Sequence, residues 1–159
     1  MISKTAEYAL RVTAWLAGRA QAPHRTQEIA QGTKVPAAYL SKVIQGLARG
    51  GLIDSRRGRN GGVALAYPPD EITILDVVRA VDPPRRIREC PLGPGYHGKN
   101  LCPLHRRLDE AVESVERVLG ETTLAEILAE PSSNQPLRQP KRTRRRKVPP
   151  RKRDVRGQR

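Results

Sequence analysis

Residues 26–67 read TQEIAQGTKVPAAYLSKVIQGLARGGLIDSRRGRNGGVALAY. Residues 26–51 have the pattern of a helix-turn-helix, two short amphipathic helices joined by a turn. Residues 53–67 have the pattern of a β-hairpin, because Asn60-Gly61 favours a tight turn in which both residues take positive φ. A helix-turn-helix followed at once by a hairpin predicts a winged helix. That unit places one helix in the major groove of DNA and lays the hairpin along the backbone or minor groove.

Cap and breaker residues set the expected helix bounds in this stretch. Thr26 can cap the first helix, and Gly32 suits its end. Pro36 is well placed at the start of the second helix, because its fixed φ matches the first helical turn. Gly50 and Gly51 are expected to end that second helix.

The helix that begins at Pro36 has an apolar and a polar face. Its apolar residues follow the i, i+3, i+4, i+7 spacing of a buried stripe. They are Leu40, Val43, Ile44 and Leu47. The polar face carries small, hydrogen-bonding and cationic side chains, which suit base edges and phosphates but also an ordinary solvated face. The basic hairpin favours DNA. The expected DNA-binding residues are Ala38, Tyr39, Ser41, Lys42 and Gln45 of the helix and Arg56, Arg57 and Arg59 near the hairpin tip.

Further helices are expected on both sides of this unit. Ser3 can cap an N-terminal helix that ends near Gly18. Thr73 can cap a helix that Asp82 and the prolines after it end. The returning strand of the hairpin should place three residues on one face: Val63, Leu65 and Tyr67. The predicted fold class is therefore mainly α with a small β-hairpin wing.

A long helix is expected over residues 103–119, followed by a short helix over residues 123–128 with a Thr123–Glu126 capping box. Apolar residues of the long helix alternate spacings of four and three, which gives a coiled-coil-like seam. They are Leu104, Leu108, Ala111, Val115 and Val118. Packing against its own domain is one reading of this stripe. We prefer a homodimer joined through this helix, because a winged-helix protein gains affinity from two copies on a two-fold operator.

The net charge of +14 is concentrated at the C-terminus. Residues 138–159 hold twelve Lys and Arg against Asp154 alone, a net +11, which leaves +3 for residues 1–137. The tail is also rich in Pro, Ser and Gln, so it is expected to be disordered. Its basic runs suit nonspecific contact with nucleic acid, with a purely solubilising role as the alternative. The expected organisation is a winged helix-turn-helix over 1–82, a cysteine loop and dimerisation helix over 83–130, and a basic tail over 131–159.

Other classes of protein are disfavoured. The N-terminal apolar stretch contains Glu7 and Arg11, so it is neither a signal peptide nor a membrane span, and a cytoplasmic protein without membrane contact is expected. No phosphate-binding loop, paired carboxylates or Ser/His/Asp constellation is present, and eleven residues separate Cys90 from Cys102, unlike the C-x-x-C of redox enzymes. An enzyme is therefore not expected. The rival to a regulator is an architectural nucleic-acid-binding protein that reads no sequence.

Soft and borderline metal ligands cluster in residues 89–110, ECPLGPGYHGKNLCPLHRRLDE. This stretch holds Cys90 and Cys102 and two of the three histidines, His97 and His105. In a cytoplasmic protein such cysteines favour metal binding or redox chemistry over a structural disulfide. Cys102 also stands at the expected N-terminus of the long helix, whose dipole favours a thiolate. A loop without chemistry is the alternative.

Residues 1–130 resemble the Rrf-two family of bacterial winged-helix regulators. The resemblance rests on TAEYALRV at residues 5–12, on the helix and glycine-rich hairpin of residues 35–66, and on the loop of residues 90–105. It implies a homodimeric transcription factor that binds double-stranded DNA and is often a repressor. It also implies that many members hold a [2Fe–2S] or [4Fe–4S] cluster that senses iron–sulfur status, redox state or nitric oxide.

The resemblance further implies a ligand set. The outer two of the family's three loop cysteines match Cys90 and Cys102, whereas no cysteine stands at the middle position, beside His97. The fourth family ligand is either a histidine after the last cysteine, matched by His105, or a carboxylate donated by the partner subunit's first helix, matched by Glu7. Mixed Cys/His ligation suits a [2Fe–2S] centre, and the same residues suit zinc. A Cys90–Cys102 thiol switch and a silent loop remain as alternatives.

Overall fold

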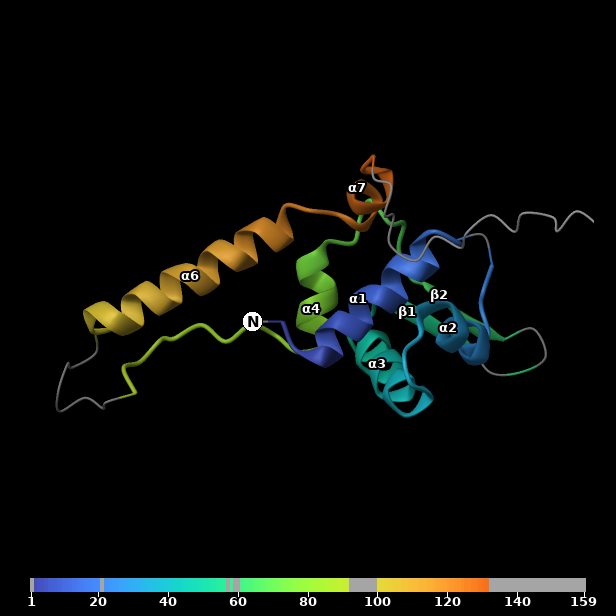
Figure 1. The fold of residues 1–159 in the computed structure, drawn as a ribbon, viewed down its shortest axis with the longest axis horizontal. Helices are drawn as coiled ribbons and strands as arrows, with labels where there is room; N and C mark the ends of the chain where they lie inside the picture. Colours follow the sequence, from blue (N-terminus) through green and yellow to red (C-terminus); the bar gives the residue numbers. More distant parts are fainter. Residues whose placement is uncertain (1, 21, 57, 59–60, 92–99, 132–159) are drawn as a thin grey trace, which may run out of the picture.

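The computed structural model describes residues 2–20, 22–56, 58, 61–91 and 100–131. Helices predominate, with one antiparallel pair of strands (Figure 1). The elements in chain order are α1 (Lys4–Ala17), α2 (Thr26–Thr33), α3 (Ala37–Arg49), β1 (Ile53–Arg56), β2 (Gly62–Leu65), α4 (Ile74–Val81), α6 (Pro103–Gly120) and α7 (Leu124–Ala129). The mainly α fold class with a small hairpin is confirmed. The tail, from residue 132 onward, lies outside the described residues.

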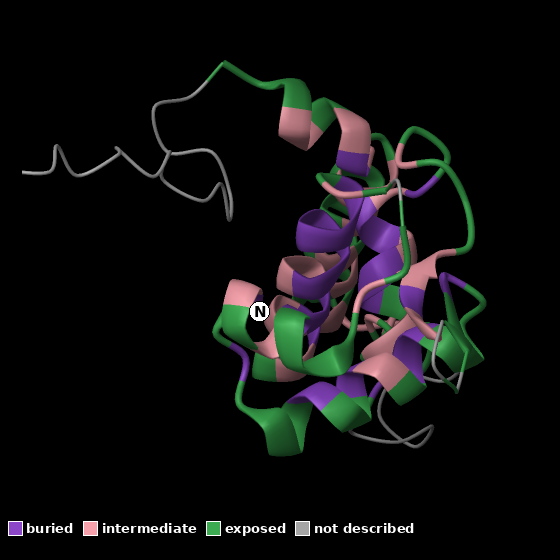
Figure 2. Cartoon of the chain, turned by 90° about the vertical axis from the view of Figure 1, so that its right-hand side faces the viewer, coloured by how far each residue is buried: buried purple, intermediate pink, exposed green. Residues whose placement is uncertain are grey.

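The hydrophobic core lies where α1 crosses the helix-turn-helix, the hairpin and α4. The backbone N–H of Ala6 donates to Oγ of Ser3 at 3.2 Å, so the expected N-terminal cap of α1 is present. Buried residues of α1 and α3 belong to one core cluster. Buried stretches of the helices gather at the centre of the body (Figure 2). The largest fully buried residues are Leu16, Ile29, Leu40, Leu47, Ile72 and Leu124. This core holds α3 with its apolar stripe inward, as the spacing predicts.

The helix-turn-helix is present, with two differences in its caps. Arg25, not Thr26, is the N-cap of α2, and the carboxylate of Glu28 accepts a hydrogen bond from the backbone N–H of Arg25. The helix continues past Gly32 to Thr33, and the turn is made by Lys34 with φ of 55°. Gly32 lies inside the helix because the Trp15 indole packs against it: a Cβ there would stand 2.1 Å from the indole Nε1.

The hairpin is shorter than residues 53–67, and the expected tight turn at Asn60-Gly61 is wrong, because such a turn needs residue 59 opposite Gly62, whereas Gly62 pairs with Arg56. Ile53 pairs with Leu65 and Arg56 with Gly62, so β2 ends two residues before Tyr67. Val63 is buried and Leu65 is partly buried, but the Tyr67 side chain is 52% exposed, so its expected place on the same face is wrong. The strand pairing stops at Leu65, and Tyr67 projects beyond the core that the strand covers.

The N-termini of α4 and α7 adjoin each other. Thr73 and Thr123 each cap their helix as expected, with Asp76 and Glu126 completing the two capping boxes. The two capping threonines also form an isolated β-bridge. Leu124 is 1% exposed and belongs to the same core as α1 and α4. The end of the chain's described part therefore packs back on the winged helix.

Helix α6 extends away from this body (Figure 1). None of its residues is buried. The seam residues are exposed, with relative exposures of 64% for Leu104, 46% for Leu108, 51% for Val115 and 54% for Val118. Within the described protomer, the seam therefore does not pack against its own domain. No helix in the described ranges is both long and apolar enough to span a bilayer.

Candidate DNA interface and metal centre

The polar face of α3 is open to solvent. All five residues expected to contact DNA from this helix are exposed: Ala38, Tyr39, Ser41, Lys42 and Gln45. The Tyr39 ring packs edge-on against the Tyr8 ring of α1, with centroids 5.6 Å apart. The exposed face of α3 offers hydrogen-bonding and cationic side chains, and its opposite face is fixed in the core. Such a helix is suited to binding in the major groove of DNA.

Gly46 of α3 and Gly50, its C-cap, bring this helix close to α4, a packing role that spacing along the sequence does not reveal. A Cβ at Gly46 would lie 2.8 Å from Cγ1 of Val81, and one at Gly50 would lie 2.6 Å from Cβ of Ala80. Contacts this short exclude a side chain at both positions unless α4 moves. The position of α3 is thus set directly by α4.

The wing is fastened to the helical body by a backbone strap. The backbone N–H of His24 donates to the carbonyl of Val63 at 2.9 Å, and the N–H of Val63 donates to the carbonyl of His24 at 2.8 Å. Gly62 makes this approach possible, since a Cβ there would lie 2.9 Å from the His24 carbonyl oxygen. Arg56 is exposed at the end of β1. Arg57 and Arg59, also expected to contact DNA, lie outside the described residues.

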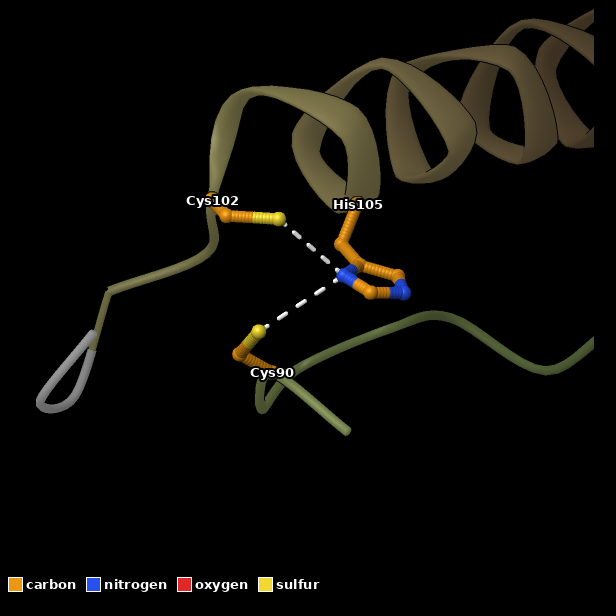
Figure 3. Close-up of side chains that lie close together, drawn as sticks. All are labelled: Cys90, Cys102 and His105. Atoms are coloured by element: carbon orange, nitrogen blue, oxygen red, sulfur yellow. Dashed lines mark hydrogen bonds between the residues drawn. The ribbon is translucent and has the colours of Figure 1, made fainter. Parts of the chain in front are cut away.

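Cys90, Cys102 and His105 come together at the start of α6 (Figure 3). Their ligand atoms all lie within 4.8 Å of one another. Nδ1 of His105 is 3.1 Å from Sγ of Cys102 and 3.6 Å from Sγ of Cys90. Cys102 is the N-cap of α6 and His105 lies one turn into the helix, whereas Cys90 arrives on the segment that follows α4. Residues distant in sequence thus form one compact donor set.

The local backbone favours the thiolate form of Cys102. A hydrogen bond from the His105 backbone lowers the pKa of the Cys102 thiol, with smaller lowering contributions from the Cys90 side chain and the Leu104 backbone, against a desolvation effect that raises it. The thiolate is the form that ligates metals.

The donor set fits a metal centre. Bond lengths of about 2.0–2.3 Å around a tetrahedral ion place neighbouring ligand atoms roughly 3.3–3.8 Å apart. The two sulfur–nitrogen distances to His105 are close to that spacing. Two sulfurs and an imidazole are also ligand types found in iron–sulfur proteins. Three protein ligands leave a tetrahedral ion one position short, so a complete site needs a fourth donor.

Neither of the other two expected ligands is placed in this group. Glu7 lies on α1, where its carboxylate accepts a hydrogen bond from Nε of Arg11 at 2.8 Å. The Arg11 guanidinium in turn stands 5.8 Å from the centroid of the Tyr8 ring. His97 lies outside the described residues. The expectation that Glu7 is donated to the partner subunit concerns an assembly of two chains and stays a prediction.

An ion-pair clamp that sequence reasoning missed holds Cys90 near α6. Arg86 donates from Nε and one terminal nitrogen to the two carboxylate oxygens of Asp109, at 2.8 and 2.7 Å. The backbone N–H of Ile87 donates to the same carboxylate at 2.8 Å. Arg86 lowers the pKa of Asp109 to about 2, mainly through these hydrogen bonds. The only hint in the sequence is the run of arginines before Cys90 opposite acidic residues of the long helix.

Comparison with known proteins agrees with this architecture. Residues 2–130 match the family model Rrf2, described as an iron-dependent transcriptional regulator. The chain is 37% identical over 134 residues to the HTH-type transcriptional regulator NsrR of Geobacillus kaustophilus, covering 80% of this chain and 88% of that protein. It is 38% identical over 89 residues to the protein aau3 of Rhizobium meliloti, and there the match spans only 58% of the relative's length.

A solved structure shares the fold. The global cysteine regulator CymR of B. subtilis superposes with a TM-score of 0.65 and 29% sequence identity, covering 80% of this chain and 95% of that one. The family model ends at residue 130, before the basic tail. The matches to NsrR and to CymR each cover 80% of this chain. The winged helix and α6 are therefore the shared part.

Proposed function

This chain belongs to the Rrf2 family of transcriptional regulators, and from that premise we propose a homodimeric DNA-binding regulator whose affinity for its operator depends on a metal centre at Cys90, Cys102 and His105. It is a regulator and not an enzyme. The observation that carries the proposal is the meeting of these three side chains at the start of α6. A cytoplasmic location, where operator DNA is accessible, is part of the proposal.

The DNA-reading part of the proposal rests on α3 and the wing. Lys42 and Gln45 supply a cation and an amide on the exposed face of α3, and Arg56 supplies a cation on the wing. Amide and cationic side chains discriminate bases in the major groove, whereas a cation on a wing contacts phosphate. The remaining assigned residues, Arg57 and Arg59, are proposed from the sequence alone.

The homodimer rests on the exposed seam of α6. Four large apolar side chains, Leu104, Leu108, Val115 and Val118, are about half or more exposed along one stripe. Their alternating spacing of four and three is that of helices that pair along a seam. A second copy of the same helix buries such a stripe by two-fold symmetry, and two-fold symmetry also matches two half-sites on DNA.

For the metal centre we propose a [2Fe–2S] cluster held by Cys90, Cys102 and His105, with a fourth donor from Glu7 of the partner subunit or from His97. Such a cluster, when bound, supplies a one-electron redox centre and sensitivity to iron supply. The residues' own contribution is to tie the segment after α4 to the start of α6. Because α4 packs against Gly46 and Gly50 of α3, a change at Cys90 has a contiguous path to the recognition helix.

The test is anaerobic purification followed by an absorption spectrum and analysis of iron, sulfide and zinc. We expect coloured protein with about two irons per subunit. Substituting Cys90→Ala or Cys102→Ala should abolish the colour and change operator affinity, and His105→Ala should remove iron or shift the spectrum. His24→Gln is the matched control for loss of an imidazole outside the group, and it should keep its iron.

Two other outcomes identify rival functions of the same residues. Stoichiometric zinc without iron indicates a structural zinc site. A metal-free protein whose operator affinity changes with peroxide indicates a thiol switch, in which the two thiols of Cys90 and Cys102 lose two protons and two electrons to the peroxide and form a disulfide. Equal affinity for operator and random DNA would indicate an architectural nucleic-acid-binding protein that reads no sequence.

A further inference from the structure

One pocket of the helical body is lined by none of the proposed metal ligands or DNA-facing residues. It has a volume of about 360 Å³ and is lined by Trp15, Arg19, His24, Glu28, Gln31 and Gly32. Trp15 comes from the end of α1, and Glu28, Gln31 and Gly32 come from α2. The volume falls at the small end of the range for pockets that bind small molecules.

One wall of the pocket is an aromatic ring with a cation held over it. The Trp15 side chain is 4% exposed. The Arg19 guanidinium lies 4.3 Å from the centroid of the Trp15 ring, and Nη1 of Arg19 donates to the Trp15 carbonyl at 3.2 Å. Within the described ranges the guanidinium has no carboxylate partner. A fixed cation without an ion pair is suited to binding an anionic group.

The opposite charge is supplied by Glu28. Its side chain is 56% exposed, and Oε2 lies 3.5 Å from Nδ1 of His24. The His24 ring stands edge-on to Trp15 with centroids 4.8 Å apart, so it lies between the aromatic wall and the carboxylate. The pocket therefore presents a cation and a carboxylate to the same small volume.

A buried hydrogen-bond donor in this wall has no partner. Nε1 of Trp15 is fully buried and makes no hydrogen bond among the described residues. Buried indole N–H groups ordinarily find an acceptor, so an orphan one needs an explanation. Gly32 closes over this edge of the ring, since even a Cβ there would lie 2.1 Å from Nε1. The close packing of Gly32 on the indole leaves this N–H without an acceptor, and no ligand atom fits between the two.

We propose that this pocket binds a small zwitterion of the α-amino acid class. Arg19 binds the carboxylate and Glu28 binds the ammonium group of this ligand. A simple anion would meet Glu28, and a simple amine would meet Arg19, so only a ligand with both charges satisfies both side chains. Neither of these two side chains is among the proposed metal ligands or DNA contacts.

His24 connects the pocket to the wing, so a bound ligand is expected to stabilise the contact between His24 and β2. The same residue that lines the pocket exchanges two backbone hydrogen bonds with Val63 of β2, at 2.9 and 2.8 Å. A ligand that holds the His24 ring between Trp15 and Glu28 also holds this strap. The backbone amide of Val63, which donates to His24, is therefore expected to exchange with solvent more slowly when the pocket is filled.

Trp15 makes the test direct, because it is the only tryptophan in the chain. The full-length protein is titrated with each non-aromatic protein amino acid, and with acetate and methylamine as probes that carry one charge each. We expect a saturable change in Trp15 fluorescence with at least one amino acid at or below about 10 mM. Acetate and methylamine should give none. No saturation with any amino acid, or equal saturation with acetate, overturns the proposal.

Substitutions locate the binding. Arg19→Gln and Glu28→Gln should each weaken the amino acid that binds by about tenfold or more, since each removes one charge-assisted hydrogen bond. Arg117→Gln and Glu121→Gln remove the same charges elsewhere and should leave binding unchanged. Amide exchange measured on the unmodified protein gives a second reading: protection of His24 and Val63 supports the site, and protection confined elsewhere refutes it.

Discussion

Lys42 and Arg56 carry the sharpest expectation for individual residues. Each is exposed on the surface proposed to face DNA and belongs to a different element. Lys42→Ala and Arg56→Ala should each weaken operator binding. If the residue contacts a base edge, the loss should be about 1–3 kcal/mol. If it contacts a phosphate, the dependence of log K on log salt concentration should become less steep. Binding is measured by fluorescence anisotropy at several salt concentrations.

Arg117→Ala is the matched control for these two variants. Arg117 is an exposed cation near the C-terminal end of α6, paired at 3.8 Å with Glu121. Its removal should leave operator affinity within error of the unmodified protein. If Lys42→Ala and Arg56→Ala also leave operator affinity unchanged, the surface formed by α3 and the wing does not bind the operator.

Gly32 gives a prediction of opposite sign to the ordinary rule. Alanine usually stabilises a helix interior by about 1 kcal/mol relative to glycine. Here the added methyl would lie 2.1–2.5 Å from the rigid, buried indole of Trp15, so Gly32→Ala should destabilise the fold by about 1–3 kcal/mol. The free energy of unfolding in urea measures this. Gly18→Ala, whose Cβ would meet nothing closer than 3.7 Å, is the control and should not destabilise.

At the scale of elements, α6 should hold two copies together. Leu108→Glu or Val115→Glu would place a carboxylate in the seam, where a charge without a partner is costly to bury. Light scattering should show dissociation or aggregation, and operator binding should fall with it. Arg117→Glu adds a carboxylate to α6 outside the five seam residues and should stay dimeric. A Leu108→Glu protein that remains a well-folded dimer would move the interface elsewhere.

The Arg86–Asp109 clamp should make stability depend on acid pH. Asp109 has its pKa lowered from 3.8 to about 2 by Arg86, so the folded state binds this proton more weakly than the unfolded state. Its contribution is complete above about pH 4 and is lost as the pH falls toward 2. Asp109→Asn should flatten the unfolding free energy between pH 4 and pH 2. Asp70→Asn, outside the clamp, should leave that slope intact; parallel curves for all three proteins would contradict the assignment.

At the scale of the whole molecule, the basic tail should add affinity without specificity. Ending the chain after Glu130 removes twelve Lys and Arg and none of the elements from α1 to α7. Random-DNA binding should weaken, and the slope of log K against log salt concentration should flatten by about 0.9 for each phosphate that the tail had neutralised. Equal salt slopes for the two proteins would show that the tail does not touch DNA.

The sequence by itself determined the elements and their faces. The helix-turn-helix, the hairpin and the long helix follow from cap residues, glycine-rich breaks and apolar spacing, which act within a few residues along the chain. The capping boxes at Thr73 and Thr123 are confirmed for the same reason. The end of α2 was wrong, because the packing of Trp15 on Gly32 comes from another helix and overrides glycine's local preference for a helix end.

Only the tertiary structure decided which distant groups meet. It clamps Arg86 to Asp109 and places Trp15, Arg19 and Glu28 around one pocket. It also brings His105 to Cys90 and Cys102, whereas the sequence offered Glu7 and His97 as ligands beside it. Each of these groupings depends on how two elements pack, and packing is set by side-chain volumes and buried contacts across the whole core, not by neighbours in the chain. Residue types and spacing predicted the kind of chemistry; the folded chain determined its partners.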